Sequence, residues 1–245
     1  MCIVLFYLKV SAQITYGTTG LLHMPSAEMQ KDKTVMIGGN FLNKENVPAT
    51  WWGHNTYNYF LNVTILPCLE IAYVCTLVKG KEGNYWPEST WGKFTNQDRY
   101  FSVKLRAIKE GQFSKYMPAV VLGANDALTT SSLSSTGAAS NGFFSRFYVV
   151  ASKHEELKGL GEVGLHLAYL YNRKEKKELP YNGVAVGASF KPEFHKDLKL
   201  IVEYDNISVN GGFLYSIWKD RLNVLFEMQK FKYPTAGVVF KVHLK

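Results

Sequence analysis

Polar residues that could do chemistry stand at alternate positions within apolar runs. The set comprises His166, His243, Ser102, Glu162, Glu203 and Glu227. A Ser-His-acid arrangement could support acyl transfer or hydrolysis if the fold brought the three groups into hydrogen-bond contact. The sequence alone does not show such a contact. The sequence therefore predicts no catalytic residue, and we expect these groups to lie paired in a solvated interior.

The cysteines and glycines give no sign of a disulfide, a metal site or a cofactor. Cys68 and Cys75 would point to opposite faces of one strand, roughly 23 Å apart and beyond disulfide reach. Cys2 lies in the apolar N-terminal run. No His/Cys/Asp spacing suggests zinc, and no glycine-rich loop has the form of a phosphate site.

The chain is basic, with 28 Lys and Arg against 20 Asp and Glu and a net charge of +8. Such an excess can indicate nucleic acid, an acidic membrane surface or an acidic substrate, and it can also serve solubility alone. Here the bases are scattered among acids on alternating strands, which argues against nucleic acid. Aromatic residues make up 14% of the chain, with 15 Tyr and 15 Phe, and this favours strands.

Strict alternation of apolar and polar residues is the dominant pattern of the chain. No uninterrupted apolar stretch reaches about 18 residues, so no membrane-spanning helix is predicted. Many of the runs have the length of about 9–11 residues that a tilted strand needs to cross a bilayer. We predict an all-β protein, an antiparallel transmembrane β-barrel of about 12 strands. The runs are Thr34–Asn43, Tyr57–Ile65, Leu69–Leu77, Phe101–Arg106, Met117–Asp126, Phe143–Lys153, Val163–Tyr171, Asn182–Phe190, Leu198–Asp205, Val209–Trp218, Leu222–Gln229 and Val238–Leu244.

The links between these runs alternate in length. Short periplasmic turns and longer extracellular loops are the outer-membrane arrangement, and both chain ends then fall on the short-turn side. Three links depart from it: Ile108–Tyr116 is a long turn, while those near Asn206 and Tyr233-Pro234 are short outer links. A soluble β-sandwich would also alternate, but the strands are long and tyrosines lie near the ends of their apolar faces. The long links are Lys44–Gly53, Lys79–Gln97, Leu128–Asn141 and Arg173–Tyr181, and the tyrosines are Tyr57, Tyr73, Tyr169, Tyr171 and Tyr204.

Before the barrel domain, residues 34–245, the chain carries two shorter segments. An apolar run followed by Val10-Ser11-Ala12 predicts a signal peptide over residues 1–12, with a buried N-terminal strand as the alternative. Residues 13–33 form an N-terminal segment that we expect to tuck into or under the barrel, unless it is a flexible leader. Pro25 ends any strand there, and Ser26 could cap a short helix over Ala27–Lys31.

Charged side chains on the inward face should line the lumen, the bases pairing partly with Glu70, Glu162, Glu203 and Glu227. The lumen candidates are Lys104, Arg106, Arg146, His166, Lys199, Glu203, Lys241 and His243. In the extracellular loop at 79–97, Tyr85, Trp86 and Trp91 could stack on sugar faces, or could simply seal the loop.

Five motifs occur in a fixed order along the chain. They are Gly17–Ala27, Met117–Asp126, Arg146–Lys153, Gly159-Leu160-Gly161 and Glu203-Tyr204-Asp205. This succession resembles the YjbH-type outer-membrane family over most of residues 17–215. The resemblance implies an outer-membrane β-barrel associated with exopolysaccharide production.

Three functions are compatible with the sequence. The first is a non-catalytic accessory to surface or exopolysaccharide export or assembly, with outer-membrane lipid, polysaccharide or export components as partners. The second is a small general pore or a structural barrel with a filled lumen. The third is a barrel lipid hydrolase or acyltransferase, for which His166 and His243 would be the first residues to mutate.

Overall fold

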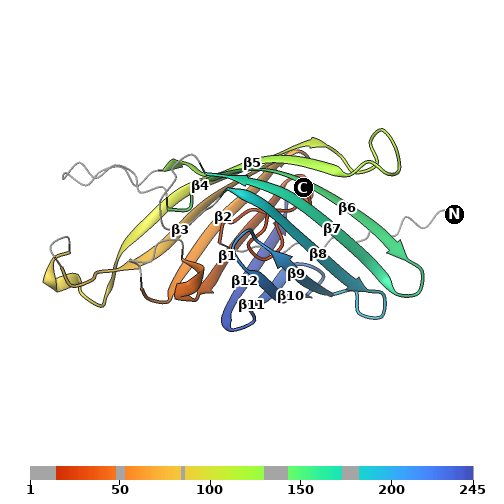
Figure 1. Cartoon of the computed structure of the whole chain (residues 1–245). Coiled ribbons are helices and arrows are strands. Elements are labelled where there is room, and N and C mark those ends of the chain that lie inside the picture. The colour runs from red at the N-terminus through yellow and green to blue at the C-terminus, as the bar shows by residue number, and fades with distance from the viewer. Residues whose placement is uncertain (1–14, 48–52, 84–85, 130–142, 173–181, 245) are drawn as a thin grey trace.

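The computed structural model describes residues 15–47, 53–83, 86–129, 143–172 and 182–244. The predicted signal peptide at residues 1–12 lies outside this part of the chain. Twelve antiparallel strands form a closed barrel in which each strand pairs with its neighbours in sequence and β1 pairs with β12 (Figure 1). The prediction of a barrel of about twelve strands is confirmed. Among the described residues, no helix is long and apolar enough to cross a bilayer.

The strands follow the alternating runs of the sequence closely. They are β1 (Thr34–Leu42), β2 (Thr56–Leu66), β3 (Leu69–Lys79), β4 (Phe94–Ile108), β5 (Ala119–Thr129), β6 (Arg146–Leu157), β7 (Gly161–Tyr171), β8 (Gly183–Pro192), β9 (Leu198–Tyr204), β10 (Val209–Ile217), β11 (Leu222–Gln229) and β12 (Tyr233–His243). The described helices are two single 3₁₀ turns, Lys44–Asn46 and Glu88–Thr90. We call the end of the barrel that holds the β2–β3 turn the short-turn end, and the opposite end the long-loop end.

Two strands, β4 and β12, begin five or more residues earlier than predicted. β4 starts at Phe94, because the polar residues before Phe101 pair with the end of β3, as in Leu77 opposite Gln97. The β3–β4 hairpin therefore reaches beyond the neighbouring strands (Figure 1). β12 starts at Tyr233, so the predicted link at Tyr233-Pro234 was wrong and the turn lies at residues 230–232.

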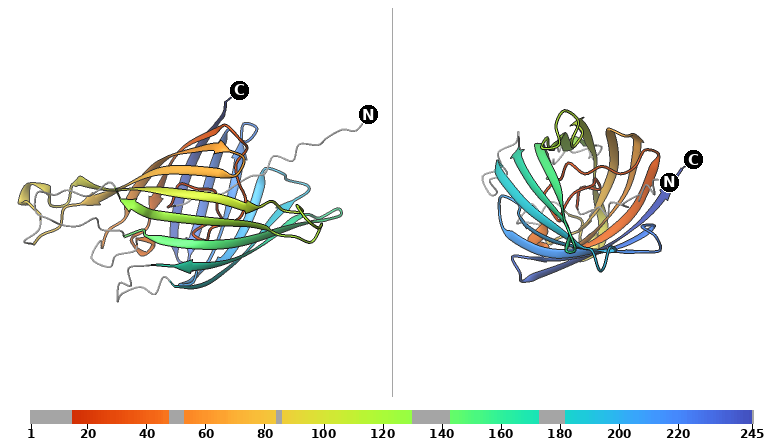
Figure 2. Two further views of the ribbon diagram at one scale, coloured as in Figure 1. Left: turned by 90° about the horizontal axis from the view of Figure 1, so that it is seen from above. Right: turned by 90° about the vertical axis from the view of Figure 1, so that its right-hand side faces the viewer.

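The two faces of the strands differ in what covers them. Side chains at alternate positions point inward and are buried, including many polar and charged ones. The N-terminal segment lies inside the ring of strands, where Figure 2 shows it in red and orange when the barrel is viewed along its axis. The interior is therefore a packed core and not the solvated lumen that we expected.

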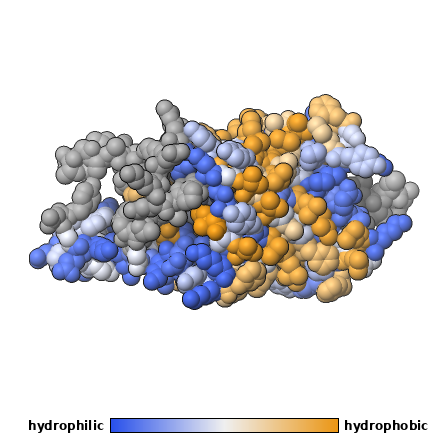
Figure 3. Space-filling model, in the orientation of Figure 1, coloured by the Kyte–Doolittle hydropathy of each residue, from blue (hydrophilic) through white to orange (hydrophobic). Residues whose placement is uncertain are grey.

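The outward face is apolar and uncovered. Large apolar side chains are exposed on β1, β2, β4 to β10 and β12; Leu165, for example, is 61% exposed. On the side shown in Figure 3 these residues gather in a band around the strands, with hydrophilic residues beyond it. An apolar band of this kind is far larger than the scattered patches that soluble monomers expose.

Aromatic side chains lie at both edges of the band. At the long-loop end they are Tyr57, Tyr59, Phe147, Tyr169, Tyr171 and Tyr204, and at the short-turn end they are Phe113, Tyr116, Phe194 and Trp218. Tyr73, which the sequence assigned to such an edge, is in the middle of β3 and packs on Phe101 with ring centroids 5.3 Å apart.

Candidate functional site

Residues 15–33, which we call the plug segment, run through the barrel interior. Leu21, Leu22 and Met24 are at most 2% exposed and form one cluster with inward side chains of the strands. The Leu21 N–H donates to the Met24 carbonyl at 2.9 Å, so the segment makes a tight turn before Pro25. The helix predicted over Ala27–Lys31 is absent, and these residues are irregular.

The barrel wall is shaped for this turn. Gly187 on β8 faces Leu21 so closely that a Cβ atom on Gly187 would lie 2.3 Å from Leu21 Cδ1. A larger side chain at position 187 would have to displace Leu21 Cδ1, so the glycine leaves room for Leu21 at this point. The packing of Leu21 against the wall thus depends both on the plug segment and on the glycine in β8.

Two inward glutamates hold the backbone of the plug segment. The Glu203 carboxylate accepts hydrogen bonds from the N–H groups of Leu22 (2.9 Å), His23 (2.6 Å) and Met24 (3.2 Å). The Glu70 carboxylate accepts from the N–H of Thr19 at 3.0 Å and that of Gln30 at 2.9 Å. Several N–H groups of the segment converge on each of these two side chains, which therefore fix its path.

Near the short-turn end, a cluster of charges centres on Glu28 of the plug segment. Lys199 Nζ lies 2.7 and 2.8 Å from the two Glu28 carboxylate oxygens, and His154 Nε2 lies 3.3 Å from one of them. Lys104 Nζ donates to the carbonyls of Glu28 and Thr19, the latter at 2.7 Å. Lys104 stands opposite Glu70, one of the predicted acidic residues, in the β3–β4 register. The plug segment adds the carbonyl oxygens that accept from Lys104 and the Glu28 carboxylate that pairs with Lys199, and periodicity does not reveal these groups.

Further polar contacts tie the plug segment to β2 and β4. Asn58 Nδ2 and Tyr100 Oη donate to the Thr15 carbonyl at 3.0 and 2.7 Å, and Asn62 Nδ2 donates to the Gly17 carbonyl at 2.9 Å. Asn58 and Asn62 are polar positions of the predicted run Tyr57–Ile65, whereas Tyr100 lies just before the predicted run Phe101–Arg106.

The remaining lumen candidates are dispersed. Lys241 is buried against Asp220 at 2.9 Å, and half-buried Arg106 donates to the Pro67 carbonyl at 2.6 Å. His243, at the rim of the short-turn end, is 2.9 Å from Thr34 Oγ1. His243 on β12 and His166 on β7 stand on strands that are not neighbours.

His166 does meet a serine, which the sequence did not identify. Its Nδ1 lies 2.8 Å from Ser152 Oγ, and its Nε2 lies 3.4 Å from Ser189 Oγ. Ser152 Oγ also accepts the N–H of Ala27 at 2.7 Å, and both Ser152 and His166 are nearly fully buried. The plug segment covers this serine, so the contact joins segment to wall.

The long turn between β4 and β5 folds back on the wall at the short-turn end. Glu110 accepts hydrogen bonds from the His154 N–H at 2.9 Å and from Lys153 Nζ at 3.0 Å, and its other oxygen lies 2.8 Å from His154 Nδ1. Burial opposes ionisation of this carboxyl group, but the His154 hydrogen bonds and Lys153 outweigh it and lower the pKa of Glu110. The unusual length of this turn lets Glu110 reach His154.

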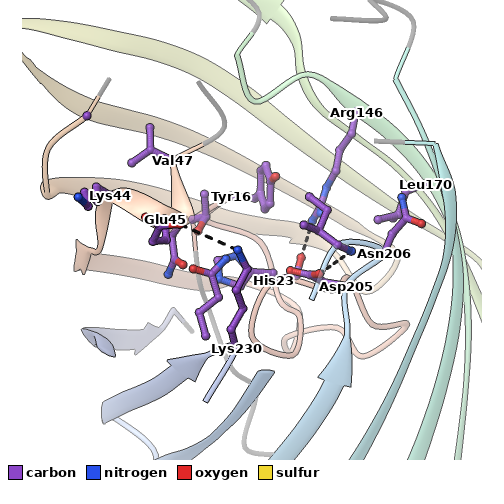
Figure 4. Close-up of a pocket in the computed structure, with 15 residues that line it drawn as sticks. Tyr16, His23, Lys44, Glu45, Val47, Arg146, Leu170, Asp205, Asn206 and Lys230 are labelled. Atoms are coloured by element: carbon purple, nitrogen blue, oxygen red, sulfur yellow. Dashed lines mark hydrogen bonds and ion pairs between the residues drawn. The ribbon is translucent and has the colours of Figure 1, made fainter. Parts of the chain in front are cut away.

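At the long-loop end, a cavity of about 360 Å³ lies above the plug segment (Figure 4). Tyr16 and His23 of the segment line it. The strands and their links contribute Lys44, Glu45, Asn46, Val47, Arg146, Leu170, Asp205, Asn206, Gln229 and Lys230. Arg146 is the one lumen candidate of the sequence that reaches this cavity, with its guanidinium 3.7 Å from the Tyr16 ring centroid and 2.9 Å from the His23 carbonyl.

The loop aromatics take a separate position. Trp91 Nε1 donates to the Trp86 carbonyl at 3.0 Å, and Trp86 packs partly against the core cluster around Tyr100. Tyr85 lies outside the described residues. The described part of the chain contains no group of three His, Cys, Asp or Glu side chains that could hold a metal ion.

These features define a closed β-barrel with an apolar outer face and an interior filled by its own N-terminal segment. The YjbH family model, described as "Exopolysaccharide biosynthesis protein YbjH", matches residues 12–178. The chain therefore belongs to the YjbH family. The match includes the plug segment but ends before the Glu203-Tyr204-Asp205 motif. No curated protein matches the chain.

Proposed function

We propose that this protein is a non-catalytic outer-membrane barrel that assists the export or assembly of an exopolysaccharide. The observation that carries the proposal is the plug segment, held by Glu70, Glu203 and Lys199 inside the barrel. These three inward charges, which could otherwise conduct ions or bind a translocated solute, are committed to the chain itself. The barrel then serves as a docking or scaffolding accessory at the cell surface, and not as an open conduit.

The outer face supports placement in the outer membrane. A bilayer is the solvent in which an apolar band around a closed barrel is stable, and aromatic rows at both edges suit the two membrane interfaces. A closed barrel also has no strand edge with unpaired N–H and C=O groups. Lipid could not form hydrogen bonds to such groups. Signal-peptide export of the chain is part of the same proposal.

The interior supports a role without bond cleavage. The Ser152 hydroxyl beside His166 is covered by the N–H of Ala27, whereas a nucleophilic serine must reach its substrate. The family description supports the link to exopolysaccharide. Outer-membrane lipid, the polysaccharide and other export components are the proposed partners.

A deletion strain tests this function. We expect loss or alteration of extracellular polysaccharide, unchanged lipid A acylation, and recovery of the polysaccharide when the wild-type chain is restored to the outer-membrane fraction. A Ser152→Ala variant should restore it equally well. Normal polysaccharide with altered lipid acylation would reject the proposal in favour of an enzyme.

A further inference from the structure

The cavity above the plug segment contains a buried cation without an anionic partner. Arg146 is 6% exposed. Its guanidinium bonds to a neutral carbonyl and stacks on Tyr16, and no carboxylate in the described part of the chain forms an ion pair with it. A buried charge is costly unless an opposite charge compensates it. Arg146 thus lacks the partner that Lys199 and Lys241 have.

The two carboxylates that line the cavity are already engaged. Asp205 accepts the N–H groups of Ile207 (2.9 Å) and Ser208 (2.7 Å) and the Asn210 amide (3.0 Å). Glu45 lies 3.9 Å from Lys230 Nζ. Neither carboxylate forms an ion pair with Arg146.

Among the other bases, His23 is paired with Glu227 at 2.9 Å, whereas Lys44 has no carboxylate partner among the described residues. Lys44 is exposed at the mouth of the cavity, across from Arg146 in Figure 4. The cavity thus keeps one buried and one exposed positive charge for an incoming anion.

Unpartnered polar atoms in the same cavity indicate hydroxyl groups on that ligand. Arg146 Nε, Gln229 Oε1 and Asn46 Oδ1 are buried without a hydrogen-bond partner, and all three side chains are at most 8% exposed. One donor and two acceptors suit the hydroxyl groups of a sugar, and Tyr16 adds an aromatic surface. A cavity of about 360 Å³ is at the lower end of small-molecule sites.

We propose that this cavity binds a carboxylate-bearing sugar unit of a surface polysaccharide, with Arg146 and Lys44 as the anion-binding groups. The proposal rests on the glycan-related function above and adds the chemical class of the glycan. Arg146 offers a planar array of donors that suits a carboxylate, and Gln229 and Asn46 accept hydrogen bonds from its hydroxyl groups.

Titration calorimetry of the purified full chain in detergent tests the site directly. The probes are an oligomer of galacturonic acid and the matching neutral galactose oligomer, which differ only in the carboxylate. We expect Lys44→Glu to raise the Kd for the acidic oligomer roughly tenfold, because it removes an attraction and adds a repulsion. Lys232→Glu makes the same charge change at an exposed position outside the cavity and should leave the Kd unchanged.

Gln229→Leu separates binding from folding. It removes a buried acceptor that has no partner in the free protein, so unfolding should be unaffected while the acidic oligomer binds more weakly. Equal affinity for the two oligomers would overturn the anionic assignment, and binding of neither would overturn the site. Neither of these binding results tests the proposed function, which the phenotype of the deletion strain decides separately.

Discussion

The inward and outward faces of the same twelve strands face different surroundings. Inward charges such as Glu203 and Lys199 are buried, and each meets a group of the plug segment. Outward residues such as Leu165 and Leu167 are exposed over more than half of their surface. One face is the core of a protein, and we propose that lipid covers the other.

The difference shows that alternation specifies which residues share a face but not what covers that face. Inward polarity commonly indicates a water-filled lumen, and here it marks the binding site of the chain's own segment. Substitutions on the two faces should therefore fail in different ways, and the following tests separate them.

The largest loss is expected at the ion pair between the wall and the plug segment. Lys199→Met leaves Glu28 as a poorly compensated buried charge, which should destabilise the folded barrel by about 3–5 kcal/mol. Guanidinium unfolding of the barrel in detergent micelles measures it. Adding Glu28→Gln should recover most of the loss, and Lys158→Met at an exposed position should change little. No loss in Lys199→Met would mean that this contact is not formed.

On the outward face, the effect of a charge should depend on depth in the bilayer. Leu165→Lys places an ammonium group midway along β7 and should cost about 2–4 kcal/mol when the barrel is folded into lipid vesicles. Leu160→Lys, in the turn before β7, should cost about 0–1 kcal/mol because it lies at the edge of the band. Equal and small costs at both sites would contradict a lipid-covered outer face.

A smaller effect is expected from overfilling the interior. Gly187→Val would place side-chain atoms in the space of Leu21 and should destabilise the barrel by about 1–3 kcal/mol. Val186→Leu enlarges the adjacent outward residue, which is half-exposed, and should be neutral. If both variants unfolded alike, Leu21 would not pack against the wall as described.

The smallest effect concerns acid sensitivity of the β4–β5 turn. Because hydrogen bonds from His154 lower the pKa of Glu110 below its ordinary value of 4.5, Glu110 stabilises the fold above that pH. This contribution is lost as the pH falls through the lowered pKa. Unfolding midpoints measured between neutral and acid pH should fall less steeply in Glu110→Gln. An unchanged slope would show that Glu110 is not engaged.

The sequence predicted the barrel because period-two alternation is a property of each strand by itself. It predicted the inward positions of Lys104, Lys199 and Glu203 for the same reason. It missed the polar residues with which β4 begins. They belong to a strand because they pair with β3, and their own sequence shows no alternation of apolar and polar residues.

The plug contacts could not be derived from periodicity. Residues 15–33 have no regular repeat, so nothing in the sequence assigns Glu28 to Lys199 or the N–H groups of Leu22 and Met24 to Glu203. One signal was present in Pro25, which excludes a regular strand there and favours an irregular turn. Gly187 was a second signal, since a glycine within a strand can leave room for another part of the chain, here the Leu21 side chain.

Ion conductance in planar lipid bilayers tests most directly whether the plug segment closes the barrel. The wild-type barrel should insert without a stable current. A Glu70→Ala/Glu203→Ala double variant, which frees the N–H groups of Thr19, Leu22 and Met24, should conduct, while Glu88→Ala in the exposed loop should remain silent. A steady current through the wild-type protein would contradict a barrel closed by its own N-terminal segment.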